Sequence, residues 1–145
     1  MEKRSLLVYV LLISLIIIDL LTKSYFLGKN FSIMPDILEI TPVKNTGIAF
    51  GLFKGSFFFT IILPIIAIIA LFYFFYKRKK PITQISLSFA ISGLVGNLIS
   101  RFVYGYVPDF ISIPFLSFVF QVFNFADLYL FVGIIMLVIS VLKEK

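Results

Sequence analysis

Four long apolar runs alternate with polar segments along the chain. They cover about residues 5–25, 57–76, 82–101 and 123–142, and the second run contains no charged residue. A helix that crosses a bilayer needs about 20 mostly apolar residues, a length that these runs reach. The pattern therefore predicts an all-α membrane protein, a four-transmembrane-helix bundle formed by a single domain over residues 1–145.

Two longer segments, residues 26–56 and 102–122, connect these spans on one side of the membrane. The first contains turn residues such as Gly28 and Gly55, and the β-branched and polar residues at 37–43 predict a short strand. We expect a small extracytoplasmic β-cradle after the first helix. The second segment is rich in Phe, Ile and Val, so we expect it to lie in the membrane interface. Residues 110–122, with Phe115, Phe118 and Phe120, could instead form a lid.

Composition supports the membrane class. Hydrophobic residues make up 61% of the chain, charged residues 14%, and the mean hydropathy is +1.11. A soluble domain has about 45–50% apolar and about 25% charged residues. The composition argues against a soluble enzyme, a disordered tail and a nucleic-acid-binding protein.

The distribution of basic residues predicts the orientation. The N-terminal flank, the segment at 77–80 and the C-terminal tail together hold eight Lys or Arg residues, all on one side of a four-span chain. The positive-inside rule then places both termini in the cytoplasm of a bacterial cytoplasmic (inner) membrane protein. The first span resembles a signal peptide, but no small-x-small cleavage site follows it and Asp19 interrupts it. We expect it to remain uncleaved.

Polar residues within the spans gather at one depth. A charge in the hydrocarbon costs at least ~2.5 kcal/mol, so such residues need a structural or functional reason. Their spacing of four and three residues puts Asn97 with Arg101, and Asn124 with Asp127, on shared helix faces. The inner half of the bundle has almost no strongly polar side chain. We expect one partly dry site in the outer half, formed by Asp19, Asn97, Arg101, Asp109, Asn124 and Asp127.

Structural explanations compete with a catalytic one. Asp127 could simply pair with Arg101, Arg101 could reach toward lipid headgroups, and Asp19 with Lys23 could form an ordinary i,i+4 ion pair. A small transporter or ion-pathway subunit could use the same acids, and an assembly subunit could lock its helices with them. Three Asp and two Asn beside one Arg are poorly balanced for structural pairing alone.

Paired carboxylates are the best catalytic option that this composition leaves. The chain has no Cys and no His, which removes thiol nucleophiles, a His base and common zinc sites, and we expect no metal or cofactor. Two carboxylates in a low dielectric share one proton, so one can activate water while the other donates to a carbonyl oxygen. Asp109 and Asp127 are the best pair, whereas Asp36 and Glu39 look like solvated surface residues.

Five stretches resemble the lipoprotein signal peptidase family, also called signal peptidase II or prolipoprotein signal peptidase. In chain order they are 19–23 (DLLTK), 45–51 (NTGIAFG), 96–101 (GNLISR), 105–110 (GYVPDF) and 123–127 (FNFAD). The resemblance covers nearly the whole chain. It implies that Asp109 and Asp127 are catalytic, and that the supporting positions are Asp19, Lys23, Asn45, Gly47, Asn97, Arg101 and Asn124.

The resemblance also implies a substrate. The family cleaves a lipid-modified prolipoprotein before its diacylglyceryl-cysteine, so the implied partners are this substrate, membrane lipid and a globomycin-type inhibitor. We expect no nucleic-acid partner and a monomer. The chain departs from the family at Ser100, where Asp is usual, and at Leu128, where Ser is usual; both could alter the hydrogen bonds around the site.

Overall fold

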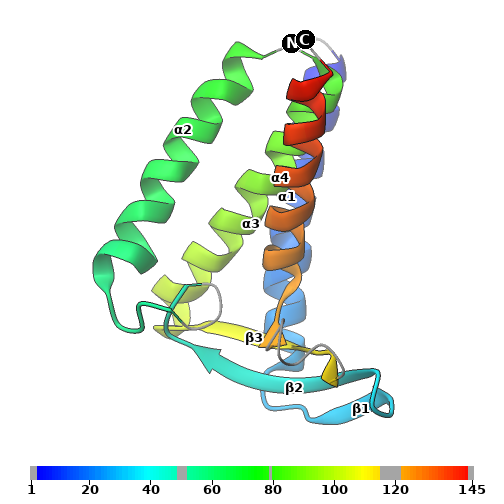
Figure 1. Cartoon of the computed structure of the whole chain (residues 1–145), viewed down its shortest axis with the longest axis vertical. Coiled ribbons are helices and arrows are strands. Elements are labelled where there is room, and N and C mark those ends of the chain that lie inside the picture. Colours follow the sequence, from blue (N-terminus) through cyan, green and yellow to red (C-terminus); the bar gives the residue numbers. More distant parts are fainter. Residues whose placement is uncertain (1–2, 49–51, 79, 115–121, 144–145) are drawn as a thin grey trace.

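The computed structural model describes residues 3–48, 52–78, 80–114 and 122–143. Helices run from one end of the molecule to a small sheet at the other (Figure 1). The helices are α1 (Lys3–Phe26), a π-helical turn η2 (Phe58–Ile62) that leads into α2 (Leu63–Lys77), α3 (Pro81–Tyr104) and α4 (Phe125–Leu142). The strands are β1 (Phe31–Met34), β2 (Leu38–Asn45), β3 (Val107–Ser112) and β4 (Val122–Phe123).

The four predicted spans are confirmed, with shifts of a few residues. Each of the four helical segments is long and apolar enough to cross a membrane. Pro81 opens α3 where its missing N–H costs no hydrogen bond. Gly105 ends the same helix in the left-handed conformation, at φ 77°. The start of α1 and the end of α4 lie at the same end of the molecule, opposite the sheet (Figure 1).

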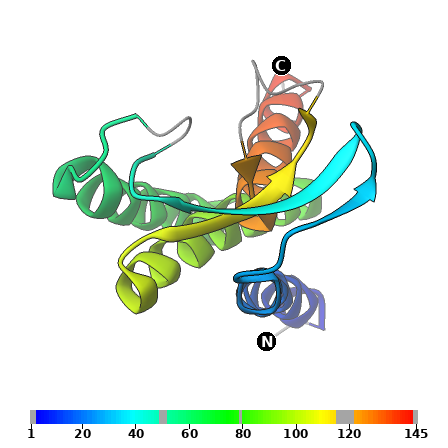
Figure 2. The ribbon, with the colours of Figure 1, turned by 90° about the horizontal axis from the view of Figure 1, so that it is seen from below.

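The sheet includes strands beyond the segment in which the cradle was expected, because β3 and β4 follow α3 in the chain. Its four strands are antiparallel in the order β1-β2-β3-β4 and lie across one end of the helices (Figure 2). The strand predicted at 37–43 is confirmed as β2. No strand was expected within 102–122, but β3 pairs there with β2 from Val107 to Ser112. The position of this segment in the membrane interface stays a prediction. Pro108 and Asp109 hide this strand in the sequence, because neither residue favours a strand interior.

The structure describes residues 110–114 and 122 of the expected lid. Phe115, Phe118 and Phe120 lie outside the described residues. The part of this stretch that precedes them, as far as Ser112, is strand, and Phe110 is buried.

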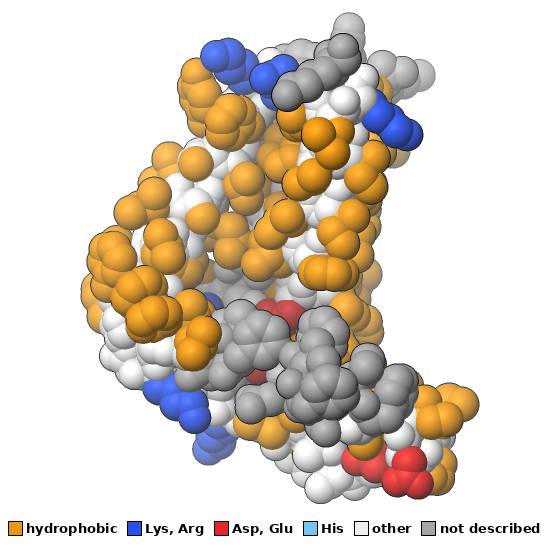
Figure 3. Space-filling model, viewed as in Figure 1, with side chains coloured by type: hydrophobic (Ala, Val, Ile, Leu, Met, Phe, Trp, Pro, Cys, Tyr) orange, Lys and Arg blue, Asp and Glu red, His pale blue; other side chains and the backbone are white. Residues whose placement is uncertain are grey.

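Helix α3 is the centre of the bundle and the most buried of the four spans. It packs against α1, α2 and α4. At the contact with α4, a Cβ on Gly133 would lie 2.8 Å from the Ser86 carbonyl oxygen, so only glycine permits this approach. Helices α2 and α3 lean away from α4 toward the sheet, and the surface between α2 and α4 is hollowed there (Figures 1 and 3).

The half of the bundle at the termini end is not free of polar side chains. It buries Thr83, Gln84, Ser86 and Ser88 on α3 and Ser140 on α4. Their hydroxyl groups are satisfied locally: Ser86 Oγ donates to the Ile82 carbonyl at 2.7 Å, and the Thr83 and Ser140 hydroxyls lie 2.9 Å apart. These groups stabilise helix packing, because unpaired polar atoms in lipid would be costly.

We predict that Gly133→Leu destabilises the bundle by about 2–3 kcal/mol, since the new side chain must push α3 and α4 apart. Thermal unfolding in detergent micelles measures the loss. Val132→Leu on the exposed side of the same turn is the matched control and should change stability by less than about 0.5 kcal/mol. Equal effects of the two variants would contradict the tight packing at Gly133.

Candidate active site

Asp109 is held on strand β3, where it faces Val43 of β2 in the sheet register. Its side chain is buried, at 3% exposure. One carboxylate oxygen, Oδ2, accepts a hydrogen bond from Asn45 Nδ2 at 2.9 Å, and the other, Oδ1, accepts from Asn124 Nδ2 at 2.6 Å. The next residue, Phe110, stacks on Phe26 of α1 with ring centroids 4.8 Å apart, which fixes the strand against the helix bundle.

Asp127 lies in the first turn of α4, as one half of a capping box with Asn124. The Asn124 N–H donates to Asp127 Oδ2 at 3.1 Å, and the Asp127 N–H donates to Asn124 Oδ1 at 3.1 Å. Asp127 Oδ1 also accepts from Asn97 Nδ2 on α3 at 2.8 Å. These bonds satisfy the exposed N–H groups of the helix start and fix the carboxylate at the same time.

Asn124 therefore connects the two carboxylates. Its side-chain amide donates to Asp109, while its backbone N–H and side-chain oxygen hold Asp127. Burial first, and then the negative charge of Asp127, raise the pKa of the Asp109 carboxyl to about 7, although hydrogen bonds from Asn45 and Asn124 oppose the shift. A carboxyl group with this pKa can hold a proton near neutral pH.

A buried ion pair supports this site from α1. Lys23 Nζ donates to Asp19 Oδ2 at 2.8 Å and to Asn97 Oδ1 at 2.7 Å, and both charged side chains are fully buried. Asp19 Oδ1 accepts from the Ala126 N–H at 2.9 Å. The i,i+4 pairing of Asp19 with Lys23 is thus present, and it is also part of a network that reaches Asp127 through Asn97.

Arg101 bonds to backbone carbonyl groups and not to the Asp127 carboxylate that the sequence suggested. Its Nη2 donates to the Gly47 carbonyl at 2.8 Å and its Nη1 to the Asn97 carbonyl at 3.4 Å, while Nε is buried without a hydrogen-bond partner. Among the residues that the structure describes, the one ion pair is Lys23–Asp19, so the idea that Asp127 is simply the ionic partner of Arg101 was wrong.

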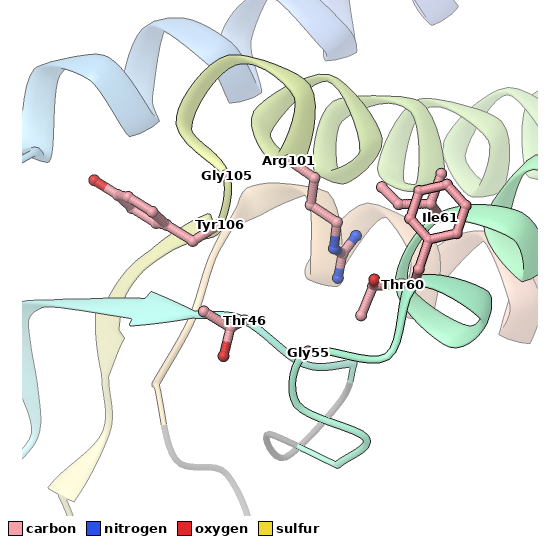
Figure 4. Close-up of a pocket in the computed structure, with 8 residues that line it drawn as sticks. Thr46, Gly55, Thr60, Ile61, Arg101, Gly105 and Tyr106 are labelled. Atoms are coloured by element: carbon pink, nitrogen blue, oxygen red, sulfur yellow. The ribbon is translucent and has the colours of Figure 1, made fainter.

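The guanidinium group of Arg101 borders a cavity of 280 Å³ at the sheet end of α3 (Figure 4). Thr60 of η2 lies across from it, and Thr46 closes the cavity from the segment after β2. The lining combines backbone, hydroxyl and guanidinium groups with apolar side chains. It can accommodate an extended polar chain that needs hydrogen-bond partners.

The site residues proposed from the sequence converge in the structure, and two supporting features were missed. Gly96 is one, because a Cβ there would collide with the Asp19 carboxylate. The backbone N–H of Ala126 is the other. The glycine next to Asn97 on a polar helix face was the available clue for Gly96, but a backbone donor leaves no mark in the residue pattern.

Ser100 and Leu128, the two departures from the family pattern, make no hydrogen bond to Asp109 or Asp127. The Ser100 hydroxyl is buried and donates to the Gly96 carbonyl at 2.9 Å within its own helix. Leu128 is 37% exposed on α4. Asn124 and Asp127 keep their mutual hydrogen bonds beside Leu128.

Comparison with known proteins agrees with this geometry. A family model described as signal peptidase (SPase) II matches residues 11–143. The chain belongs to this family. It is therefore a lipoprotein signal peptidase, an aspartic-type enzyme, and not the transporter or assembly subunit considered as alternatives.

Individual relatives cover most of the chain. Lipoprotein signal peptidases from Staphylococcus aureus strains JH9 and Newman are each 38% identical over 120 residues, which is 81% of this chain and 74% of theirs. Two solved bacterial membrane enzymes are each 34% identical. The first has a TM-score of 0.86 and covers 94% of this chain and 88% of its own. The second has a TM-score of 0.83 and covers 95% and 94%.

We predict that Lys23→Met lowers the stability of this peptidase by about 3–5 kcal/mol, because it leaves the Asp19 carboxylate buried without its cation. The double variant Asp19→Asn/Lys23→Met should recover roughly half of that loss, since no unpaired charge remains and Asn keeps an acceptor for the Ala126 N–H. Thermal unfolding in detergent measures both.

Lys29→Met is the control, since this lysine lies at the surface over the Tyr25 ring and should contribute less than about 1 kcal/mol. A double variant no more stable than Lys23→Met would contradict a buried ion pair whose separate charges are costly.

Proposed function

We propose that Asp109 and Asp127 are the catalytic dyad of this lipoprotein signal peptidase, and that the enzyme cleaves a prolipoprotein on the N-terminal side of its diacylglyceryl-modified cysteine. The observation that carries the proposal is the placement of Asn124, which bonds to Asp109 and to Asp127 at once. A single residue between the buried carboxylate of Asp109 and the half-buried one of Asp127 keeps both beside the same small volume. That arrangement suits a shared proton and an attacking water.

The chemistry follows from one proton on the pair. The ionised carboxylate takes a proton from water as the water oxygen attacks the scissile carbonyl, and the protonated carboxyl donates to the carbonyl oxygen. The resulting gem-diol then collapses and the C–N bond breaks. The departing amine takes the proton that the first carboxylate received from water, and a gem-diol hydroxyl returns a proton to the second carboxylate. Burial of Asp109, with its pKa of about 7, supports a dyad that keeps its proton near neutral pH.

The surrounding polar groups fit an extended substrate backbone. A peptide that leaves its helix inside a membrane needs new partners for its N–H and C=O groups. We assign this role to Asn45, Gly47, Asn97, Arg101 and Asn124; the unpaired Nε of Arg101 beside the cavity supports it. Asp19 and Lys23 act as positioning residues through Asn97.

The substrate is itself anchored in the bilayer, so we expect it to arrive sideways. The hollowed, largely hydrophobic surface between α2 and α4, with acidic side chains at its sheet end, gives acyl chains an apolar path to the dyad (Figure 3). We place the site toward the extracytoplasmic face and both termini in the cytoplasm, because the basic residues gather at the termini end. We also expect a single-domain monomer that globomycin inhibits.

We predict that Asp109→Asn and Asp127→Asn each lower the cleavage rate by roughly 10²–10⁴-fold or more, because each removes an acid–base group from the dyad. Purified enzyme in detergent and a diacylglyceryl-modified prolipoprotein provide the assay, with unfolding temperature as the check on folding. Asp36→Asn and Glu39→Gln, in acids outside the site, should stay near the wild-type rate. Folded Asp109→Asn and Asp127→Asn enzymes that still cleave would refute the dyad.

We predict that cleavage falls as pH rises through about 7, because Asp109 then loses the proton that the pair shares. Asn45→Leu removes a hydrogen bond that lowers the pKa of Asp109, so it should move this decline to higher pH. Lys44→Met at the exposed neighbouring position should leave it in place. The pH profile of kcat/KM is the measurement, and a decline that Asn45→Leu does not move would count against Asp109 as its source.

A further inference from the structure

A second cavity lies at the opposite end of the molecule from the dyad. It has a volume of 370 Å³ and lies between the start of α3 and the end of α4. The lining residues are Lys80, Ile82, Met136, Ile139, Ser140 and Lys143. This space is larger than a single small ion needs.

Two features give this cavity an amphipathic character. Lys80 and Lys143 supply positive charge from two different helix ends. Ile82 and Ile139 supply apolar walls, and both are nearly half exposed. Below them, the hydrogen bond between Thr83 and Ser140, at 2.9 Å, holds the two helices together.

The charge of this end is strongly positive. The segments at the ends of the chain and at 77–80 contain eight Lys or Arg and two Glu residues. The first turn of α3 contains no acidic residue. The acids that the structure describes lie in the half of the molecule nearer the sheet; they are Asp19, Asp36, Glu39, Asp109 and Asp127. Basic side chains are visible at the termini end in Figure 3.

An apolar stripe continues from the cavity toward the bilayer centre. Ile139, Ile135 and Val132 follow each other at spacings of four and three residues, so they share one face of α4. All three are exposed. An acyl chain lying along this face would therefore contact exposed apolar side chains.

We propose that this cavity, which we call the Lys80–Lys143 site, binds one anionic phospholipid from the leaflet around the chain termini. The phosphate lies between the two lysines, and an acyl chain runs over Ile139 toward Val132. Basic pockets between transmembrane helices on the cytoplasmic side are suited to anionic headgroups. The inference goes beyond the proposed peptidase function and does not depend on the dyad.

The test compares lipid retention by native mass spectrometry. The full-length enzyme is reconstituted in vesicles of phosphatidylcholine with one-fifth phosphatidylglycerol, extracted gently, and examined for bound lipid. Each lysine near an anionic lipid contributes about a fivefold preference, so Lys80→Gln/Lys143→Gln should reduce retained phosphatidylglycerol on the order of 25-fold. Lys77→Gln/Arg78→Gln removes the same charge from the same end but lies outside the cavity lining, and should change retention less than about threefold.

A third variant separates a seated lipid from diffuse attraction. Ile139→Trp fills the cavity without changing charge, and should also lower retained phosphatidylglycerol by about tenfold while the enzyme remains folded. Inorganic phosphate at 10-fold excess over lipid should not displace the bound molecule, because phosphate lacks the acyl chain.

Three results would overturn the proposal. They are equal losses in the two double variants, unchanged retention in Ile139→Trp, and complete displacement by phosphate. Prolipoprotein cleavage is expected to continue in all of these variants, so failure of the lipid site and failure of the catalytic dyad remain distinguishable.

Discussion

The hydrogen bonds of Asn124 are the constraint on which the site depends. This buried residue begins α4, and its backbone and side chain satisfy the helix start while its amide reaches strand β3. A buried amide in a low-dielectric region must find partners, or the protein loses roughly 1–3 kcal/mol per unsatisfied group. The same requirement that stabilises the helix end therefore also fixes the separation of Asp109 and Asp127.

The Asp19–Lys23 pair extends this constraint to α1. A fully buried ion pair is expensive to desolvate, and it persists where every atom finds a partner. Lys23 bridges to Asn97, and Asp19 bridges to the backbone of α4, so α1, α3 and α4 meet at one polar point. Gly96 permits the carboxylate to approach α3 closely. Helix α2 has no part in this network and diverges from it, leaving the hollow that a membrane-bound substrate would need (Figure 3).

The two ends of the molecule thus have different physical character. At the sheet end, acids and amides that are buried or half-buried share hydrogen bonds. At the termini end, exposed basic side chains surround an apolar-walled cavity. A charge in the membrane costs several kcal/mol when it is buried alone and little when it reaches the interface, and this difference accounts for both arrangements.

The sequence by itself indicated the four spans, strand β2 and the cluster of polar residues around Asp109 and Asp127, because membrane length, hydropathy and the cost of intramembrane charge act locally along the chain. The supporting positions Asn45 and Gly47 came only from the resemblance to the family. The sequence did not predict strand β3, because this strand forms by pairing Asp109 opposite Val43, and these residues lie more than sixty positions apart. Tertiary structure alone decided that Arg101 bonds to the Gly47 carbonyl and that Lys23 takes the place beside Asn97. Spacing shows which residues share a helix face, whereas the partner across a helix interface depends on how closely the backbones can pack.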